Sequence, residues 1–239
     1  SYSPVGNFGK AFKDFFIYLN LRNEIIIDNL ERKSREGTNY KGDVYFKFRE
    51  NQEVLAFEMN ESGDMLVITD SLGEMKVFYP QKKRSSQGIS FLCGEGIKLV
   101  RITGEYIFLG GDLELIYVFK RREDDNIDFV KEINHCLFGI TALDYNIEEQ
   151  RLLYGSNNSL YEIKEALSTK SPQNGVELFE EEFGNMDFIT DIRFSPEKGH
   201  VAIAFAKRIY IVSSQNKLLF YIDFEIKNEE ICMLNFLKD

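Results

Sequence analysis

The sequence contains few of the residues that usually build catalytic or metal sites. Its 239 residues include two His, three Cys, four Pro and no Trp. The cysteines, Cys93, Cys136 and Cys232, have no paired spacing, so they predict reduced thiols in a cytoplasmic compartment rather than a disulfide framework. No zinc-type Cys/His spacing occurs, and we expect neither a metal nor another cofactor. No apolar run reaches the about 18 residues that a membrane-spanning helix needs, so we expect no membrane insertion.

Recognisable catalytic sets are also missing. His135 and His200 are far apart in the sequence, and no Gly-x-Ser-x-Gly occurs. Gly94-Glu95-Gly96 is not followed by a helical pattern that would present its N-terminus to a phosphate. The acidic runs Glu123–Asp125 and Glu180–Glu182 lack the alternating ligand spacing of calcium loops. We therefore predict that the protein is not an enzyme.

The net charge of −10 argues against a general binder of nucleic acid or anionic membranes, because both need a basic surface. Two local basic clusters are exceptions: Lys82-Lys83-Arg84 and Lys120-Arg121-Arg122. They have two interpretations, solvated loop charge or a contact for phosphates or an acidic partner.

One six-residue pattern recurs five times along the chain. Each copy begins with a β-branched residue and has an apolar fourth and a large apolar sixth residue. The copies are Val54–Met59, Ile97–Ile102, Ile140–Tyr145, Ile189–Phe194 and Ile231–Phe236. A period of roughly 40–45 residues with strand-like content is typical of a β-propeller. We expect the apolar residues of these first strands to be buried, among them Ile140, Leu143, Ile189 and Ile192.

Three further apolar segments separated by turns follow each copy. After Val54–Met59 they are Met65–Ile68, Met75–Phe78 and Ile89–Leu92, and the unit before it has Phe15–Leu19, Glu24–Asp28 and Asp43–Phe48. Four short antiparallel strands make one propeller blade. The sequence therefore predicts one all-β domain over residues 1–239, with blades at about 1–50, 54–95, 97–135, 140–183 and 189–226 and a further first strand at 231–236.

The blade number has two explanations. Tyr2-Ser3-Pro4 parallels Phe194-Ser195-Pro196, which places residue 1 near the end of a first strand, and 231–236 is again a first strand. Either the sequence is part of a larger, seven-bladed propeller or of a longer multidomain protein, or the last strand completes the first blade and closes a ring of five. Closure would remove exposed sheet edges.

The repeats resemble the WD40 family, with degenerate sequences. Phe194-Ser195-Pro196-Glu197-Lys198-Gly199 is similar to the family's turn between first and second strands, and Asn60–Asp64 occupies the same place in an earlier repeat. The family's Trp-Asp pair falls on Phe78-Tyr79, Phe119-Lys120, Ile163-Lys164 and Val212-Ser213, and its turn Asp falls on Leu72, Leu113, Asn157 and Ala206. Only Asn134-His135 lies near the family's Gly-His. The resemblance thus implies a WD-type propeller that lacks most of the usual Asp–His–Trp hydrogen bonds.

Binding is expected on the face that carries the turns between second and third strands and the connections between blades, because loops carry function in such folds. The residues predicted there are Asp112, Leu113, Phe138, Asn157, Asn158, Asp187, Phe188, Lys207 and Arg208. Phe138 and Phe188 either anchor a partner or fold down between blades.

The resemblance implies a non-catalytic scaffold that docks other proteins in a multi-subunit complex. We expect a cytoplasmic protein of a cytoskeletal or ciliary assembly. The alternative is an RNA-associated propeller subunit of a ribonucleoprotein complex, which would use the two basic clusters.

Overall fold

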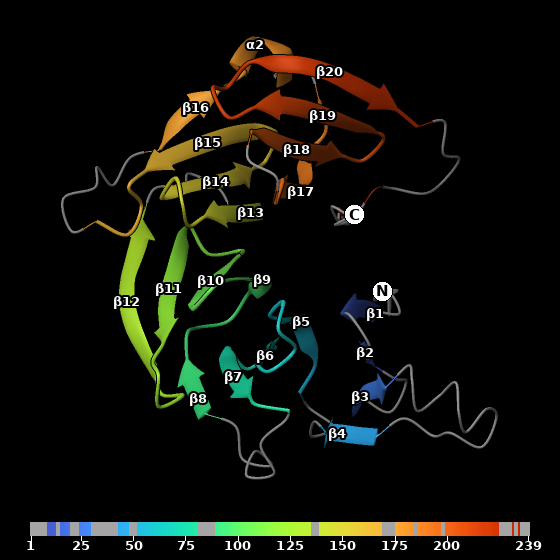
Figure 1. The fold of residues 1–239 in the computed structure, drawn as a ribbon, viewed down its shortest axis with the longest axis vertical. Helices are drawn as coiled ribbons and strands as arrows, with labels where there is room; N and C mark the ends of the chain where they lie inside the picture. Colours follow the sequence, from blue (N-terminus) through green and yellow to red (C-terminus); the bar gives the residue numbers. More distant parts are fainter. Residues whose placement is uncertain are drawn as a thin grey trace. The chain divides into compact units, whose positions relative to one another are not determined.

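The computed structural model describes residues 9–12, 15–19, 24–29, 43–47, 52–80, 89–134, 139–168, 175–183, 186–196, 199–224, 231 and 234. The chain divides into two compact units, 1–102 and 103–239. The described part is built almost entirely of strands, and its helix α2 (Glu180–Phe183) is four residues long (Figure 1). An all-β chain is what the short, alternating apolar segments predict.

The strands of residues 1–102 are β1 (Gly9–Phe12), β2 (Phe15–Leu19), β3 (Glu24–Asn29), β4 (Asp43–Lys47), β5 (Val54–Met59), β6 (Leu66–Asp70), β7 (Glu74–Phe78), β8 (Ile89–Leu92) and β9 (Ile97–Thr103). Those that follow are β10 (Tyr106–Gly111), β11 (Leu115–Arg121), β12 (Ile127–Asn134), β13 (Ile140–Asn146), β14 (Arg151–Ser156), β15 (Ser159–Lys164), β16 (Val176–Leu178), β17 (Ile189–Phe194), β18 (His200–Phe205), β19 (Arg208–Ser213) and β20 (Leu218–Asp223).

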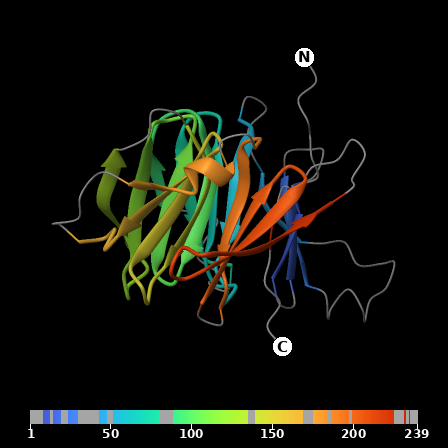
Figure 2. The same ribbon diagram turned by 90° about the horizontal axis from the view of Figure 1, so that it is seen from above.

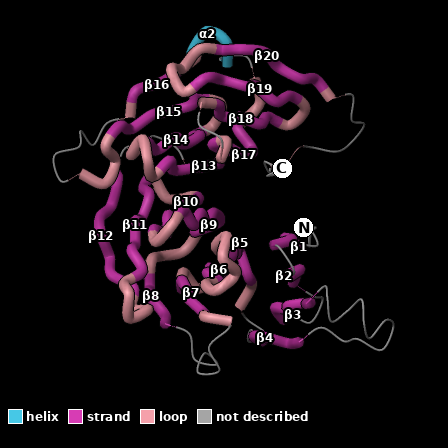
Figure 3. Tube along the Cα trace, viewed as in Figure 1, coloured by secondary structure: helices cyan, strands magenta, loops and turns pink. Residues whose placement is uncertain are grey.

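The described strands form five four-stranded sheets, in the orders β1-β2-β3-β4, β5-β6-β7-β8, β9-β10-β11-β12, β13-β14-β15-β16 and β17-β18-β19-β20. Within each sheet, strands that are neighbours in sequence are neighbours in space, and short loops join most of them (Figure 3). Adjacent strands run antiparallel, as in the pairs β1–β2, β5–β6, β13–β14 and β17–β18. The predicted four-stranded antiparallel blades are confirmed.

Two elements were not indicated by the sequence pattern. Gly9–Phe12 forms β1 and pairs with β2, so the first sheet already has its first strand after residue 8. The interpretation of Tyr2-Ser3-Pro4 as the end of a first strand falls outside the described residues. Glu180–Phe183 forms one helical turn, where the sequence suggested an acidic edge beside the fourth strand.

A β-bulge recurs at the start of three first strands. The pairing register shifts between Val54 and Ala56 in β5, between Ile140 and Ala142 in β13, and between Ile189 and Asp191 in β17. The second residue of the six-residue repeat is therefore the extra one each time. Such bulges bend the strand and increase its local twist.

The core of residues 1–102 packs the first two sheets together. Buried Ile17, Ile25 and Ile27 from β2 and β3 contact Phe57 and Leu66 from β5 and β6. Side chains of this size contribute about 1.5–3 kcal/mol each when buried. Apolar residues of neighbouring repeats thus interlock within this unit.

The core of residues 103–239 includes a similar layer between the sheets of β13–β16 and β17–β20. It contains Phe183 of α2 together with Leu153, Leu160, Ile203 and Tyr210. Ile140, Leu143, Ile189 and Ile192 are all buried, with exposed fractions of 4% or less, so the predicted register of the first strands is confirmed.

Two glycines allow close contact between successive sheets of this unit. A Cβ added to Gly155 would lie 2.8 Å from Cβ of Ile189, and one added to Gly110 would lie 3.0 Å from Cβ of Ile140. Each glycine is the penultimate residue of a second strand, and each isoleucine begins the next first strand. Any larger residue would push the sheets apart.

Candidate protein-interaction surface

The turn between second and third strands lies against the segment that leads to the next sheet. In the first unit, the N–H of Cys93 donates to the carbonyl of Gly73, at 2.8 Å. In the second, the N–H of Ile189 donates to the carbonyl of Asn157 and the N–H of Ile231 to that of Ala206. The structure thus brings each of these turns together with the connection that the sequence placed beside it.

The β10–β11 turn carries the first two predicted surface residues. Asp112 is exposed and Leu113 is half-buried. A Cβ on Gly139 would lie 2.6 Å from the carbonyl oxygen of Gly111 and 3.1 Å from Cα of Asp112. The connection therefore passes directly over this turn. Phe138, the predicted anchor in this connection, lies outside the described residues.

The β14–β15 turn positions the second group. Asn157 has φ +58°, a conformation that Asn adopts more readily than most residues, and it is exposed. Asn158 donates from its side-chain amide to the carbonyl of Phe183, at 3.4 Å. These contacts hold the segment after α2, in which Asp187 is exposed and Phe188 has an exposed fraction of 48%. Phe188 therefore does not fold down into the core.

The β18–β19 turn carries Lys207 and Arg208. Lys207 is exposed, and its carbonyl accepts a hydrogen bond from Phe224. The guanidinium of Arg208 lies over the ring of Tyr221, 4.3 Å from its centroid, and forms two hydrogen bonds with Asp223. These bonds with Asp223 raise the pKa of Arg208 above its usual range. Arg208 is thus a fixed cation on this surface.

Tyr210 links Arg208 to the Phe188 segment. Its hydroxyl lies 3.1 Å from a guanidinium nitrogen of Arg208 and donates to Sδ of Met186, at 3.7 Å. Its ring lies 4.9 Å from the ring of Phe183. The sequence did not indicate Tyr210, Tyr221 or Met186. Tyr210 and Tyr221 are strand residues, and the alternating apolar pattern of a strand is the same whether a residue faces the core or the rim of the sheet.

The β6–β7 turn is fixed by the carboxylate of Asp70. The WD-type turn Asp falls on Leu72, but Asp70 two residues earlier accepts hydrogen bonds from the N–H groups of Leu72 and Glu74. It also accepts from Lys76 and Gln52. A buried carboxylate thus fixes the β6–β7 turn from a position other than that of the family's turn Asp.

Buried carboxylates also join successive first strands in the second unit. Asp144 on β13 accepts a hydrogen bond from the N–H of Phe194 on β17, at 2.8 Å. Asp191 on β17 accepts one from the N–H of Leu234, at 2.7 Å, and the Leu234 carbonyl accepts from Arg193. Leu234, which lies within the fifth predicted copy of the repeat, is therefore held beside β17 by hydrogen bonds.

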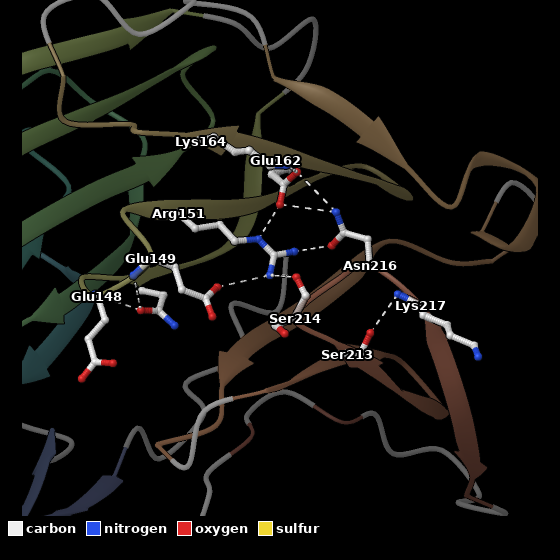
Figure 4. A network of polar contacts seen from close by, with 10 residues as sticks. Glu148, Glu149, Arg151, Glu162, Lys164, Ser213, Ser214, Asn216 and Lys217 are labelled. Atoms are coloured by element: carbon white, nitrogen blue, oxygen red, sulfur yellow. Dashed lines mark hydrogen bonds and ion pairs between the residues drawn. The ribbon is translucent and has the colours of Figure 1, made fainter.

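Arg151, the first residue of β14, joins its sheet to the β19–β20 turn of the next sheet. Its guanidinium donates to Glu162, to the side chain of Asn216 and to the carbonyl of Ser214, the last at 3.1 Å (Figure 4). The side chains of Arg151 and Glu162 have exposed fractions of only 5% and 6%. Because every contact is internal, this network holds the sheets together rather than offering a binding site.

The described basic cluster is paired with acidic residues. Lys120 forms an ion pair with Glu105 at 2.9 Å, and a hydrogen bond to Glu105 raises its pKa. Arg121 donates twice to Asp125, and Arg122 lies 3.5 Å from Asp128. The positive charge of this cluster is thus partly neutralised locally. Lys82, Lys83 and Arg84 lie outside the described residues.

The described residues include no group of three or more His, Cys, Asp or Glu side chains arranged to hold a metal ion. Cys93 is buried, and desolvation raises its pKa to about 11, so its thiol is protonated at neutral pH. His200 is exposed, and His135 lies outside the part that is described. No helix among the described residues is long and apolar enough to span a membrane.

Comparison with solved structures identifies the fold. A structure described as "Crystal Structure of Mitotic Checkpoint Complex" matches with a TM-score of 0.71 and 10% identity, over 92% of this chain and 64% of that one. The WD40 β-propeller domain of Doa1 matches with a TM-score of 0.65 and 10% identity, over 92% and 67%. The sheets are blades of the WD40 β-propeller type.

The WD40 likeness is one of fold rather than of sequence. No family model and no curated protein matches this chain. The chain spans less than two thirds of the checkpoint-complex chain that it matches. WD40 blades with so little sequence signal agree with the complete absence of Trp and the displaced turn carboxylate.

Proposed function

We propose that this WD40-type chain is a non-catalytic scaffold that binds a protein partner through the surface around Phe188. We define the Phe188 surface as Asn157, Asn158, Asp187, Phe188, Lys207 and Arg208, all in residues 103–239. The observation that carries the proposal is the exposed Phe188 ring on a segment held by Asn157 and Asn158. Aromatic residues and Arg are enriched in binding hot spots, and Tyr210 and Met186 link Arg208 to the segment that carries Phe188.

The surface is also rigid enough to recognise a partner. Hydrogen bonds fix both ends of the segment, and Arg208 is held by Asp223 and Tyr210. Side chains that are already ordered lose less conformational entropy on binding. The Phe188 surface as defined contains charges of both signs, Asp187 with Lys207 and Arg208, which suits a protein partner better than a polyanion.

The test is affinity capture from cells that express the full-length protein. Phe188→Ala should reduce recovery of a specific partner at least tenfold, as expected for loss of a hot spot worth about 1.4 kcal/mol or more. Phe129→Ala on β12 is the matched control, because Phe129 has a similar exposed fraction of 52%. Equal recovery with Phe188→Ala and with the unchanged protein would refute the proposal.

The cellular setting rests on the sequence alone. We propose a cytoplasmic protein of a cytoskeletal or ciliary assembly, and imaging of the tagged protein is the test. The RNA-associated alternative requires the two basic clusters, of which the described one is paired with carboxylates. RNA binding that weakens steeply with salt would favour this alternative.

A further inference from the structure

Among the fourth strands whose side chains are described, β20 carries the largest number of exposed large apolar residues. Its exposed residues are Leu219 (42%), Phe220 (54%), Tyr221 (52%) and Ile222 (45%), and Phe224 (37%) follows directly. β20 is the outer strand of its sheet, and no described strand pairs with its free edge (Figures 1 and 2). Such an edge is a template for pairing with another strand.

The free edge lacks the features that usually prevent such pairing. Residues 218–224 contain neither Pro nor Gly, and their one charged residue, Asp223, is already bonded to Arg208. The segment combines high β-propensity with low net charge, which favours strand association.

The register of β20 fixes which backbone groups face outward. Ile222 lies opposite Ile209, and the N–H of Phe224 donates inward to the carbonyl of Lys207. Because backbone groups alternate in direction along a strand, those of Phe220, Ile222 and Phe224 point inward. The N–H and C=O groups of Tyr221 and Asp223 therefore point away from the sheet.

These observations indicate one partner for the free edge of β20. We propose that β20 pairs antiparallel with β20 of a second copy of this chain, about a twofold axis at Ile222. In that register Tyr221 of each copy exchanges backbone hydrogen bonds with Asp223 of the other. Ile222 lies opposite Ile222, and Phe220 lies opposite Phe224, which are favourable cross-strand pairs.

The charges suit this twofold register. The guanidinium of Arg208 lies over the Tyr221 ring. In the proposed register Asp223 of the second copy lies opposite Tyr221, on the same face of the sheet as this guanidinium. No like charges are brought opposite each other within residues 220–224. An arrangement that is complementary to itself is what a twofold dimer requires. One strand pair buries less than the about 1,200 Å² of ordinary stable interfaces, so we expect a concentration-dependent dimer.

Cysteine cross-linking tests the register directly. In Ile222→Cys the two Cα atoms would be about 4.5 Å apart across a non-hydrogen-bonded pair, within reach of a disulfide. In Phe220→Cys the two copies of residue 220 would be four residues out of register, about 13 Å apart. Mild oxidation should therefore give a covalent dimer with Ile222→Cys and not with Phe220→Cys, and the unsubstituted chain sets the background from its own cysteines.

Sedimentation at several concentrations provides the second measurement. The unchanged chain should shift from monomer to dimer, and Ile222→Lys should remain monomeric with an unchanged circular dichroism spectrum. Leu92→Lys on β8, where Leu92 has an exposed fraction of 81%, should still dimerise. A chain that stays monomeric at all concentrations, open-ended growth, or equal cross-linking of both cysteine variants would overturn the proposal.

Discussion

Ile189 is a single side chain on which the packing of two sheets depends. It is fully buried, begins the bulged strand β17 and lies against Gly155, where no Cβ fits. Its contacts join two sheets rather than one strand to its neighbour. Shortening a buried side chain at such a contact leaves a cavity that the surrounding residues cannot fill.

Replacing Ile189 by Ala should therefore lower the free energy of unfolding by about 2–5 kcal/mol, from lost burial and the remaining cavity. The measurement is the urea midpoint at constant m-value. Ile147→Ala is the control, because Ile147 has an exposed fraction of 44% and should shift the midpoint little. An unchanged midpoint for Ile189→Ala would show that the register of β17 is wrong.

Cys93 offers a second prediction at the scale of the residue. Its pKa is raised from 9.0 to about 11 by burial, so the folded state holds the proton more tightly than the unfolded state. This contribution to stability is complete below pH 9 and is lost as the pH rises from about 9 to 11. Alkylation of Cys93 at pH 8, followed by peptide mapping, should be about 100-fold slower in the folded than in the unfolded chain. Similar rates in both states would contradict the burial of Cys93.

At the scale of the element, hydrophobic periodicity predicts the strands well and the polar contacts poorly. Val54–Met59 and Ile189–Phe194 are strands with the bounds that the repeat predicts. β1 was missed because Gly-Lys-Ala-Phe has no alternating apolar pattern. The bond from Asp144 to Phe194 was missed because its acceptor and donor are 50 residues apart and the donor is a backbone group, which the sequence does not mark.

The candidate surface was also predicted only in part from the sequence. Turns rich in Asn, Asp and Gly identify where loops lie, and Asn157 is indeed at such a turn. The sequence does not show which strand residues reach the rim, so Tyr210 and Tyr221 were not predicted. Exposure at the rim depends on how two sheets meet, which is a property of packing rather than of local pattern.

The Arg151 network leads to a prediction for a pair of elements. Arg151→Met should lower the free energy of unfolding by about 3–5 kcal/mol, because it leaves the carboxylate of Glu162 buried without its guanidinium. Arg122→Met is the matched control, since the exposed pairs of Arg122 should contribute less than about 1 kcal/mol. Urea unfolding followed by tyrosine fluorescence measures both. Equal effects would show that the network is not buried.

For the whole molecule, the contacts of Ile231 and Leu234 matter most. The N–H of Ile231 donates to Ala206, and Leu234 bonds with both Asp191 and Arg193. Deletion of residues 229–239 should therefore destabilise residues 103–239 and expose Asp191 to solvent. A lower urea midpoint together with faster proteolysis within β17–β20 is the expected result. Unchanged stability would mean that these bonds do not form in solution.

The carboxylate of Asp144 has a consequence for exchange with solvent. β13 and β17 each provide a side-chain carboxylate that accepts a hydrogen bond from a backbone N–H in the repeat that follows. Protection of these amides therefore depends on the preceding repeat as well as on their own sheet. In deuterated water, the Phe194 amide should exchange at a rate set by opening of β13. Asp144→Asn should then accelerate exchange of the Phe194 amide, which lies one repeat after the substitution. The exchange rate of this amide therefore measures how strongly the stability of one repeat depends on the repeat before it.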